Sequence, residues 1–96
     1  MIVALDYDKT YTADPDLWDT FILKCIANGH SVICITMRFP SETIPEDLKS
    51  WESEGIKIYY TSRKAKLVWA KQNNIKVDIW IDDNPGWLFD DAASAA

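Results

Sequence analysis

Residues that bind zinc are scarce in this 96-residue chain, which has two cysteines and one histidine. Cys25 and Cys34 lie in apolar segments, and His30 follows Gly29 at an expected helix end. No spacing among them matches a zinc site, so we expect a capping or surface role for His30. The two thiols are interpreted as reduced core cysteines of a cytoplasmic protein, with a disulfide as the less favoured alternative.

Long apolar stretches and an excess of positive charge are also missing. No run approaches the roughly 20 apolar residues that span a bilayer, and the first residues lack the basic and apolar regions of a secretion signal. These absences predict a cytoplasmic protein without a membrane segment. The net charge of -5 repels a phosphate backbone, so a nucleic-acid partner is not favoured, and the lysines between residues 57 and 76 are interpreted as a solvated face.

Length and composition predict one domain over residues 1–96. The chain is 48% hydrophobic and 26% charged, and it shows no internal repeat or linker. Four short apolar runs predict strands at residues 2–5, 31–36, 56–60 and 77–81. Helical patterns separate them, so the expected fold class is α/β, with a parallel sheet, right-handed crossovers and helices on both faces.

Three helices are expected between these strands. Asp14 can cap the first helix, which has Pro15 in its first turn and Gly29 as its stop. The second helix is short and covers residues 45–55, and the third covers residues 63–73. The apolar residues expected to pack inward from these helices are Leu17, Trp18, Phe21, Ile22, Cys25, Ile26, Leu48, Trp51, Leu67, Val68 and Ala70.

Polar side chains follow the expected strands at the point where each strand ends. Because parallel strands point the same way, their carboxyl ends meet at one edge of the sheet, where ligands bind in such folds. Two lysines fall in the expected first turn of the third helix, where the helix dipole disfavours cations, which points to something anionic nearby. The residues expected to converge at this edge are Asp6, Asp8, Thr36, Arg38, Lys64, Lys66, Asp82 and Asp83.

The carboxylates in this group suit a small hard cation. Mg2+ prefers oxygen ligands and often bridges to a substrate phosphate. A lysine, an arginine and a hydroxyl beside it would hold a phosphoryl group. One aspartate could then attack phosphorus, while a second one two residues away protonates the leaving oxygen and later activates water. Taken by itself, the stretch of residues 6–10 is interpreted equally well as a solvated loop that contains two acids.

The chain resembles the haloacid dehalogenase-like hydrolase superfamily, most of whose members are Mg2+-dependent phosphatases. The first motif of that family, D-x-D-x-T, matches residues 6–10, which read Asp-Tyr-Asp-Lys-Thr. The resemblance implies that Asp6 is the nucleophile and that Asp8 is the general acid/base, with a backbone carbonyl on the metal. The second motif, a hydroxyl at the end of the second strand, matches Thr36, which would hydrogen-bond the phosphoryl group.

The last two family motifs are a lysine and an acidic pair. Lys66 is our choice for the lysine, with Lys64 as the alternative, and Asp82 and Asp83 match the acidic pair. The resemblance implies that this pair binds Mg2+ together with Asp6 and Asp8. An additional acid that many relatives carry after the pair is replaced by Trp87, so this metal contact is either missing or supplied by Asp90 or Asp91.

The resemblance further implies a small, capless, three-layer Rossmann-like domain with strand order 3-2-1-4. Both intervals that hold a cap domain in larger members contain only a helix and its connections here. Capless relatives often act on exposed phosphates of macromolecules, although some take small molecules. Substrate contacts are expected from Lys9, Thr10, Arg38 and Lys64. Lys9 stands where the family usually has glycine, so the loop either differs in shape or presents a cation to the substrate.

Two further classes of function stay open. The same acids, hydroxyl and lysine would suit a regulatory module that binds Mg2+ and a phosphoryl group without turnover, or an idle adaptor on the same fold. The second carboxyl group of the first motif favours hydrolysis, because it supplies the acid/base step that such modules lack. The tryptophans are interpreted as core residues, except Trp87, which lines the cleft or covers the sheet edge.

Overall fold

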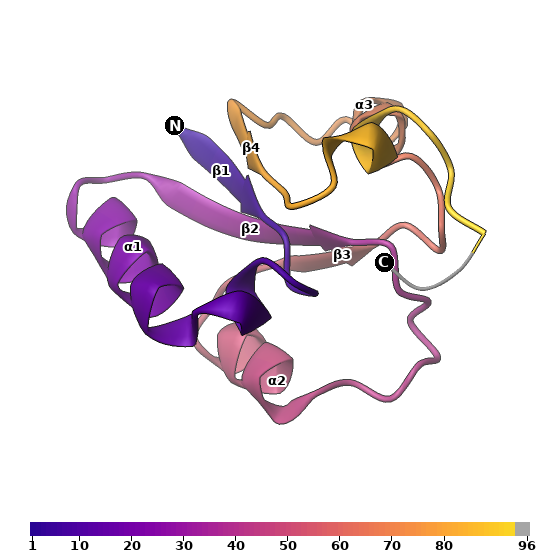
Figure 1. The fold of residues 1–96 in the computed structure, drawn as a ribbon. Coiled ribbons are helices and arrows are strands. Elements are labelled where there is room, and N and C mark those ends of the chain that lie inside the picture. Colours follow the sequence, from indigo (N-terminus) through magenta and orange to yellow (C-terminus); the bar gives the residue numbers. More distant parts are fainter. Residues whose placement is uncertain (94–96) are drawn as a thin grey trace.

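A parallel sheet of four strands forms the middle layer of the computed structural model, which describes residues 1–93 (Figure 1). The strands are β1 (Ile2–Leu5), β2 (Ser31–Thr36), β3 (Ile58–Tyr60) and β4 (Ile79–Ile81). Their order in the sheet is β3-β2-β1-β4, and every neighbouring pair is parallel. The predicted α/β class, strand order and Rossmann-like arrangement are therefore confirmed.

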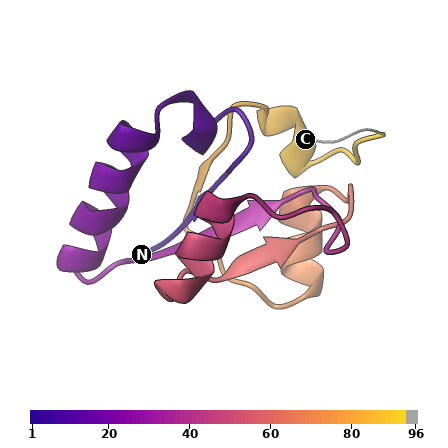
Figure 2. The ribbon, with the colours of Figure 1, turned by 90° about the horizontal axis from the view of Figure 1, so that it is seen from below.

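Helices cover both faces of this sheet (Figure 1). Helices α1 (Pro15–Ala27) and α2 (Glu46–Ser53) pack on one face, and α3 (Lys66–Gln72) packs on the other. Two short 3-10 helices, η1 (Tyr11–Ala13) and η2 (Pro85–Leu88), follow β1 and β4. The views in Figure 1 and Figure 2 both show β2 and β3 side by side.

Alternate residues of the central strands supply the two halves of the core. Val32 and Cys34 of β2 pack with Leu48 and Trp51 of α2, and Leu5 of β1 joins them. The neighbouring residues of the same strands point to the other face, where they form a second cluster with α3. Successive side chains of a strand point to opposite faces, so an uninterrupted apolar run is what a strand with two covered faces requires.

Residues that were expected to start or stop the first two helices lie at the ends of these helices. The Asp14 side chain accepts a hydrogen bond of 3.2 Å from the backbone N–H of Leu17, and Pro15 is the first residue of α1. Gly29 and Gly55, just past the ends of α1 and α2, have φ values of +80° and +90°. Glycine adopts this left-handed conformation without the steric cost that a Cβ atom brings.

The third helix begins later than predicted. It starts at Lys66, whereas the sequence pattern indicated residue 63. Ser62 and Arg63 have φ values of 54° and 70°, which are incompatible with a right-handed helix. The Thr61 hydroxyl donates to the carbonyl of Lys64 over 2.8 Å and closes the turn that precedes α3. Lys64 therefore lies before the helix, and only Lys66 is in its first turn.

Strands β3 and β4 are shorter than predicted, and the inward-facing surfaces of α1 and α3 are narrower than predicted. Strand β3 starts at Ile58, because the N–H of Ile56 bonds to the carbonyl of Trp51 and so completes the turn after α2. Strand β4 starts at residue 79, two residues later than expected. The inward-facing residues of α1 form a narrow stripe around Ile22, so Leu17 and Ile26 are exposed, contrary to prediction. Val68 of α3 is likewise exposed.

The cysteines and tryptophans follow the predictions in part. Cys25 and Cys34 are free thiols, and Cys34 is fully buried. Trp51 is buried in the core, whereas the remaining tryptophans are half-buried. Within residues 1–93, no helix has the length and apolar character needed to cross a bilayer.

Candidate functional site

The carboxyl ends of β1 and β4 bring two distant aspartates to one lysine. Asp6 directly follows β1, and its N–H extends the β1–β4 ladder with a bond of 2.9 Å to the carbonyl of Ile81. Lys66 reaches this point from the first turn of α3. Its ammonium nitrogen lies 2.8 Å from Asp6 Oδ1 and 2.6 Å from Asp82 Oδ2. The expected convergence of these strand-end residues is therefore present.

A hydroxyl completes this cluster on the side away from Lys66. Thr10 Oγ1 lies 3.1 Å from both Asp6 Oδ2 and Asp83 Oδ1, and it accepts a 3.0 Å hydrogen bond from the N–H of Asp83. One hydroxyl carries a single proton, so Thr10 can donate to only one of these carboxylates at a time. The residues Asp6, Thr10, Lys66, Asp82 and Asp83 are called the acidic cluster below.

The acidic cluster has the donors of a metal site. One carboxylate oxygen from each of Asp6, Asp82 and Asp83 can be chosen so that the three lie within 4.8 Å of one another. Oxygen-only donor sets of this kind suit hard divalent cations such as Mg2+. Asp90 and Asp91, the candidates for an additional acid, do not belong to this group. Asp91 instead accepts a 2.7 Å hydrogen bond from the N–H of Ala65 before α3.

Burial sets the protonation chemistry of Asp6. Desolvation raises the pKa of its carboxyl to about 7, and the nearby Asp82 charge adds to this effect, while Lys66 opposes it. Desolvation on its own would lower the pKa of Lys66, but the attraction and hydrogen bonds of Asp6 and Asp82 outweigh it, so the pKa of Lys66 is raised. Lys66 is only 1% exposed. It is therefore a permanent buried cation between two acids.

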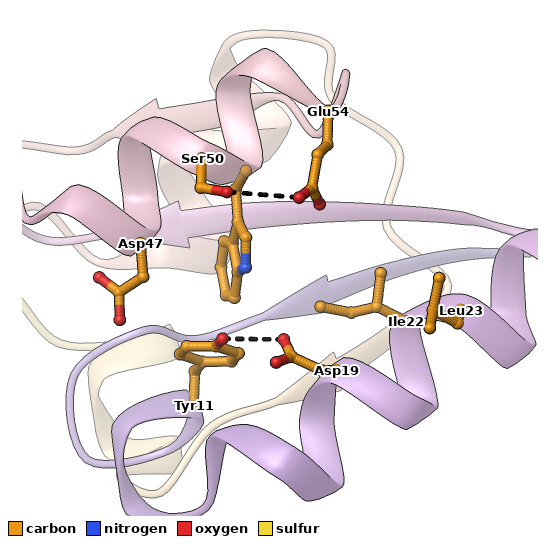
Figure 3. A pocket seen from close by; sticks show the side chains of 8 residues that line it. Tyr11, Asp19, Ile22, Leu23, Asp47, Ser50 and Glu54 are labelled. Carbon is orange, nitrogen blue, oxygen red and sulfur yellow. Dashed lines mark hydrogen bonds between the residues drawn. The ribbon is translucent and has the colours of Figure 1, made fainter.

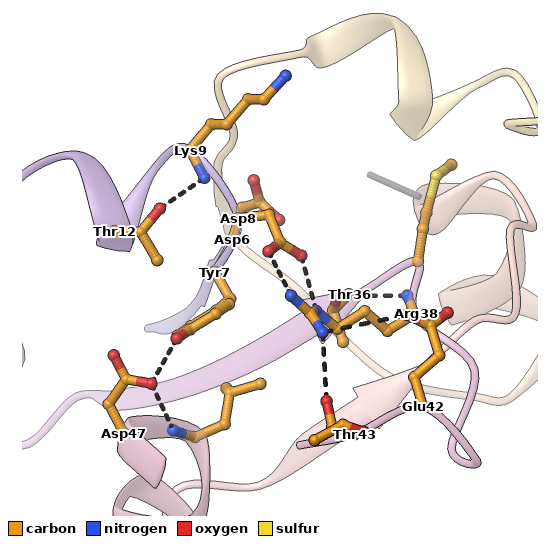
Figure 4. A network of polar contacts seen from close by, with 12 residues as sticks. Asp6, Tyr7, Asp8, Lys9, Thr12, Thr36, Arg38, Glu42, Thr43 and Asp47 are labelled. Carbon is orange, nitrogen blue, oxygen red and sulfur yellow. Dashed lines mark hydrogen bonds and ion pairs between the residues drawn. The ribbon is translucent and has the colours of Figure 1, made fainter. Parts of the chain in front are cut away.

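Asp8 lies outside the acidic cluster, bound to an arginine (Figure 4). Arg38 Nε donates to Asp8 Oδ2 over 2.9 Å, and Arg38 Nη2 donates to Asp8 Oδ1 over 2.7 Å. Two parallel bonds of this type fix both side chains more tightly than a single contact would. The sequence placed Asp8 and Arg38 at the same edge but did not predict that they pair with each other.

Other contacts hold Arg38 in this position (Figure 4). Its guanidinium carbon lies 5.7 Å from the centre of the Tyr7 ring, a cation–π arrangement. The Tyr7 hydroxyl donates in turn to Asp47 in the first turn of α2. Tyr7 is buried and packs edge-on against Trp51.

The other predicted site residues occupy different positions. Thr36 lies at the same strand edge, but its side chain is fully buried and accepts a 3.3 Å hydrogen bond from the N–H of Arg38. Lys64 is exposed, and its nearest acid is Asp91 at 3.9 Å. Of the two candidate lysines, the structure thus brings only Lys66 to the acidic cluster.

Lys9 adopts a conformation that favours glycine. Its φ of 65° is left-handed, and its N–H donates over 2.9 Å to the Thr12 hydroxyl (Figure 4). Glycine adopts this conformation at the least cost, so Lys9 carries a cation on a loop shape that glycine would favour. Lys9 is exposed, and its contact with a substrate stays a prediction.

A separate hollow lies between α1 and α2 (Figure 3). It has a volume of about 290 Å3 and is lined by aromatic and acidic side chains, among them Tyr11, Trp51 and Asp47. The Tyr11 hydroxyl donates to Asp19 over 2.8 Å. This hollow shares no residue with the acidic cluster.

Comparisons of the chain with models of protein families, with curated proteins and with solved structures give no match. The resemblance drawn from the motifs therefore stays a prediction. The support for a functional site comes from the distances, burial and charges described above.

Proposed function

We propose that the protein is a Mg2+-dependent phosphomonoesterase that works through an aspartyl-phosphate formed on Asp6. The observation that carries this proposal is the surroundings of the Asp6 carboxyl group. A buried lysine binds one of its oxygens, a hydroxyl lies beside the other, and two further acids stand within reach of the same metal ion. A structural ion pair alone would not need the additional acids.

The residues present fit Mg2+. The three carboxylates would hold the ion, with the backbone carbonyl of Asp8 as an additional oxygen donor in line with the family motif. When bound, Mg2+ would neutralise charge on the phosphoryl oxygens. Lys66 would act on the same charge from the other side of Asp6.

The chain's own groups would perform the reaction in two displacements. An Asp6 oxygen attacks phosphorus, so that a new oxygen–phosphorus bond forms while the bond to the leaving group breaks. Asp8 in its protonated form gives its proton to the leaving oxygen. Asp8 then takes a proton from a water molecule, whose oxygen attacks phosphorus and releases phosphate and free Asp6.

The pair formed by Asp8 and Arg38 sets a condition on this cycle. Both Asp8 oxygens accept hydrogen bonds from Arg38, so Asp8 cannot give a proton to a leaving group until this contact opens. A phosphoryl group offers the guanidinium an alternative partner with several anionic oxygens. Binding of substrate would therefore move Arg38 from Asp8 to the phosphoryl group, and the freed Asp8 carboxylate would take up a proton from solvent, which it then gives to the leaving oxygen.

The same pair favours a second candidate function. If Arg38 never leaves Asp8, the site would accept a phosphoryl group on Asp6 or bind Mg2+ without turnover, as a regulatory or adaptor module would. Beryllium fluoride, which imitates an aspartyl-phosphate, distinguishes the two functions. Binding of this analogue with Mg2+, combined with no turnover over a broad panel of phosphate esters, would favour the module.

Hydrolysis of an aryl phosphate with and without Mg2+ tests the main proposal. The wild type should release phosphate only with Mg2+, and Asp6→Asn should abolish turnover because an amide cannot form the intermediate. Its fold, followed by circular dichroism, should stay intact. Equal rates for the wild type and Asp6→Asn would exclude Asp6 as the nucleophile. The phosphorylated substrate is a small molecule or an exposed phosphate on a macromolecule.

A further inference from the structure

An apolar hollow lies directly beside the acidic cluster. It has a volume of about 380 Å3 and sits between the start of α1 and the carboxyl end of β4. Three residues of the acidic cluster also line this hollow: Thr10, Asp82 and Asp83. A molecule in the hollow would therefore contact three members of the acidic cluster, although Asp6 and Lys66 do not line the hollow.

The rest of the lining is mostly apolar. Ala13, Leu17, Trp18 and Ile81 contribute it, while Asp14 uses a carboxylate oxygen to cap α1. Leu17 is 55% exposed at the start of α1. Trp18 is half-buried and packs against Phe21, so the exposed apolar surface is mainly that of Leu17, and covering it with an apolar ligand would be favourable.

Lys9 stands where the hollow meets the loop of residues 6–10. It lines the hollow, and within residues 1–93 its ammonium group makes no ion pair or side-chain hydrogen bond. Its left-handed backbone fixes where the side chain leaves the loop. A cation at this junction is complementary to a phosphoryl group whose organic part extends into the hollow.

We propose that this hollow binds the organic part of the substrate and that this part is a flat, apolar group such as an aromatic ring. The proposal rests on the phosphomonoesterase function proposed above and adds the substrate class. Trp18 is half-buried and lines the hollow with part of its indole, and contact with an aromatic side chain favours aromatic ligands. Lys9 would bind the phosphoryl end of the ester, and Leu17 and Trp18 would bind the ring.

The volume of the hollow fits this ligand. Cavities of about 150 Å3 lined by apolar residues accept benzene, and sites for small molecules generally have about 300–1,000 Å3. The hollow of about 380 Å3 is shallow and broadly open to solvent, so one or two fused rings would fit on it with one face covered and the other in water. The larger hollow at the opposite edge of the sheet, near Lys57 and Lys76, contains no residue of the acidic cluster.

Binding of two phosphonates tests the proposal without requiring turnover. Phenylphosphonate and methylphosphonate share the anionic group and differ in the ring. In the presence of Mg2+, the wild type should bind phenylphosphonate about tenfold more tightly, the scale expected when roughly half of a ring is buried. The indole N–H signal of Trp18 in NMR spectra, identified with Trp18→Phe, should shift with phenylphosphonate and not with methylphosphonate.

Leu17→Gln and Leu23→Gln form a matched pair of variants. Both leucines are exposed on α1, with Leu23 at 70%, but Leu23 does not line the hollow. Leu17→Gln should remove most of the preference for phenylphosphonate and leave the affinity for methylphosphonate unchanged, while Leu23→Gln should change neither. Lys9→Gln should weaken the binding of both phosphonates by the same factor.

The outcomes separate this proposal from the function on which it rests. Equal affinities of the wild type for the two phosphonates would overturn the aromatic subsite. Equal losses of affinity for both phosphonates in Leu17→Gln would overturn it too. Either result would leave the proposed phosphoryl site unaffected. If neither phosphonate binds, the phosphomonoesterase function fails and the subsite fails with it. If the ratio of the affinities for phenylphosphonate and methylphosphonate is the same in Leu17→Gln as in the wild type, the ring does not bind in this hollow.

Discussion

Lys66 lies 2.8 Å from Asp6 although the two residues are 60 positions apart in the chain. Both side chains are buried, and Lys66 also neutralises Asp82. We expect Lys66→Met to lower the free energy of unfolding by about 3–5 kcal/mol at neutral pH, because two buried acids lose their cation. Urea unfolding measures this loss, and added Mg2+ should restore part of it.

Lys64→Met is the control for this change. Lys64 is exposed, and its contact with Asp91 is 3.9 Å long. Exposed pairs of this kind contribute little, so the free energy of unfolding should change by less than about 0.5 kcal/mol and turnover should persist. Similar losses of stability in the two variants would contradict the central position of Lys66.

Stability should depend on pH through Asp6. Burial raises its pKa from 3.8 to about 7 in the folded protein, so the folded state holds this proton more tightly than the unfolded state. The resulting stabilisation is complete below about pH 4 and is lost as the pH rises through 7. At a scale of about 1.4 kcal/mol per pKa unit, the effect amounts to a few kcal/mol. Urea unfolding gives the free energy of unfolding of the wild type and of Asp6→Asn. The value for the wild type minus the value for the variant should decrease from pH 5 to pH 8. A difference that stays constant over this range would contradict the raised pKa of Asp6.

Mg2+ should stabilise the protein more at high pH than at low pH. A metal competes with the proton on Asp6, so its affinity should rise as the pH approaches 7 and level off above it. At a concentration of 100 times Kd, the ion would add about 2.7 kcal/mol to the free energy of unfolding. The thermal midpoint, recorded with Mg2+ and after chelation, measures this effect. Asp83→Asn should reduce the rise of the thermal midpoint that Mg2+ causes. If the rise is the same in this variant as in the wild type, Asp83 is not a ligand of the metal.

Asp8→Asn separates catalysis from stability. We expect the rate of phosphate release to fall by about 100-fold or more, because the amide cannot transfer the proton. Its contact with Arg38 is partly solvent-exposed, so the stability should change by no more than about 1 kcal/mol. Steady-state kinetics and urea unfolding measure the two effects. If Asp8→Asn released phosphate as fast as the wild type, another group would have to transfer the proton.

Lys9→Gly and Lys9→Val test the left-handed loop. A residue other than glycine at a φ of 65° costs about 1–2 kcal/mol, which glycine avoids while losing about 0.5–1 kcal/mol in chain entropy. Lys9→Gly should therefore keep or slightly raise the stability. Lys9→Val should lower it, because a β-branched residue tolerates this conformation poorly. A loss in Lys9→Gly larger than that in Lys9→Val would contradict the assigned backbone.

The residue patterns predicted a parallel α/β sheet and the residues at its strand ends, whereas the strand order 3-2-1-4 came from the family resemblance. Apolar runs with helices between them restrict the chain to few topologies, and parallel strands then bring Asp6, Lys66 and Asp82 to one edge. Helix α3 was misplaced because nothing in the residue types at positions 62 and 63 shows a left-handed backbone. That conformation depends on tertiary contacts, such as the 2.9 Å bond from the N–H of Arg63 to the carbonyl of Met37.

The partner of Asp8 could not be read from the sequence for a related reason. Spacing shows that Asp8 and Arg38 share an edge, but the direction of each side chain depends on how the two loops leave their strands. Tyr7 and Asp8 illustrate this: Tyr7 packs edge-on against Trp51 of α2, while the next residue, Asp8, meets the guanidinium of Arg38. Such contacts between loops carry no periodic signal.

Strand β1 lies between β2 and β4, so the last strand of the sheet completes the surroundings of the first. A nascent or partly folded chain could pair β1, β2 and β3 while β4 is still undocked, which would leave Lys66 without Asp82 and the metal site without two ligands. Pairing of segments so far apart in the chain carries a larger loop-closure cost than pairing of neighbouring segments. Phosphate release would then report the completion of folding, and molecules caught in such intermediates would be silent in an activity assay even though most of their sheet had formed.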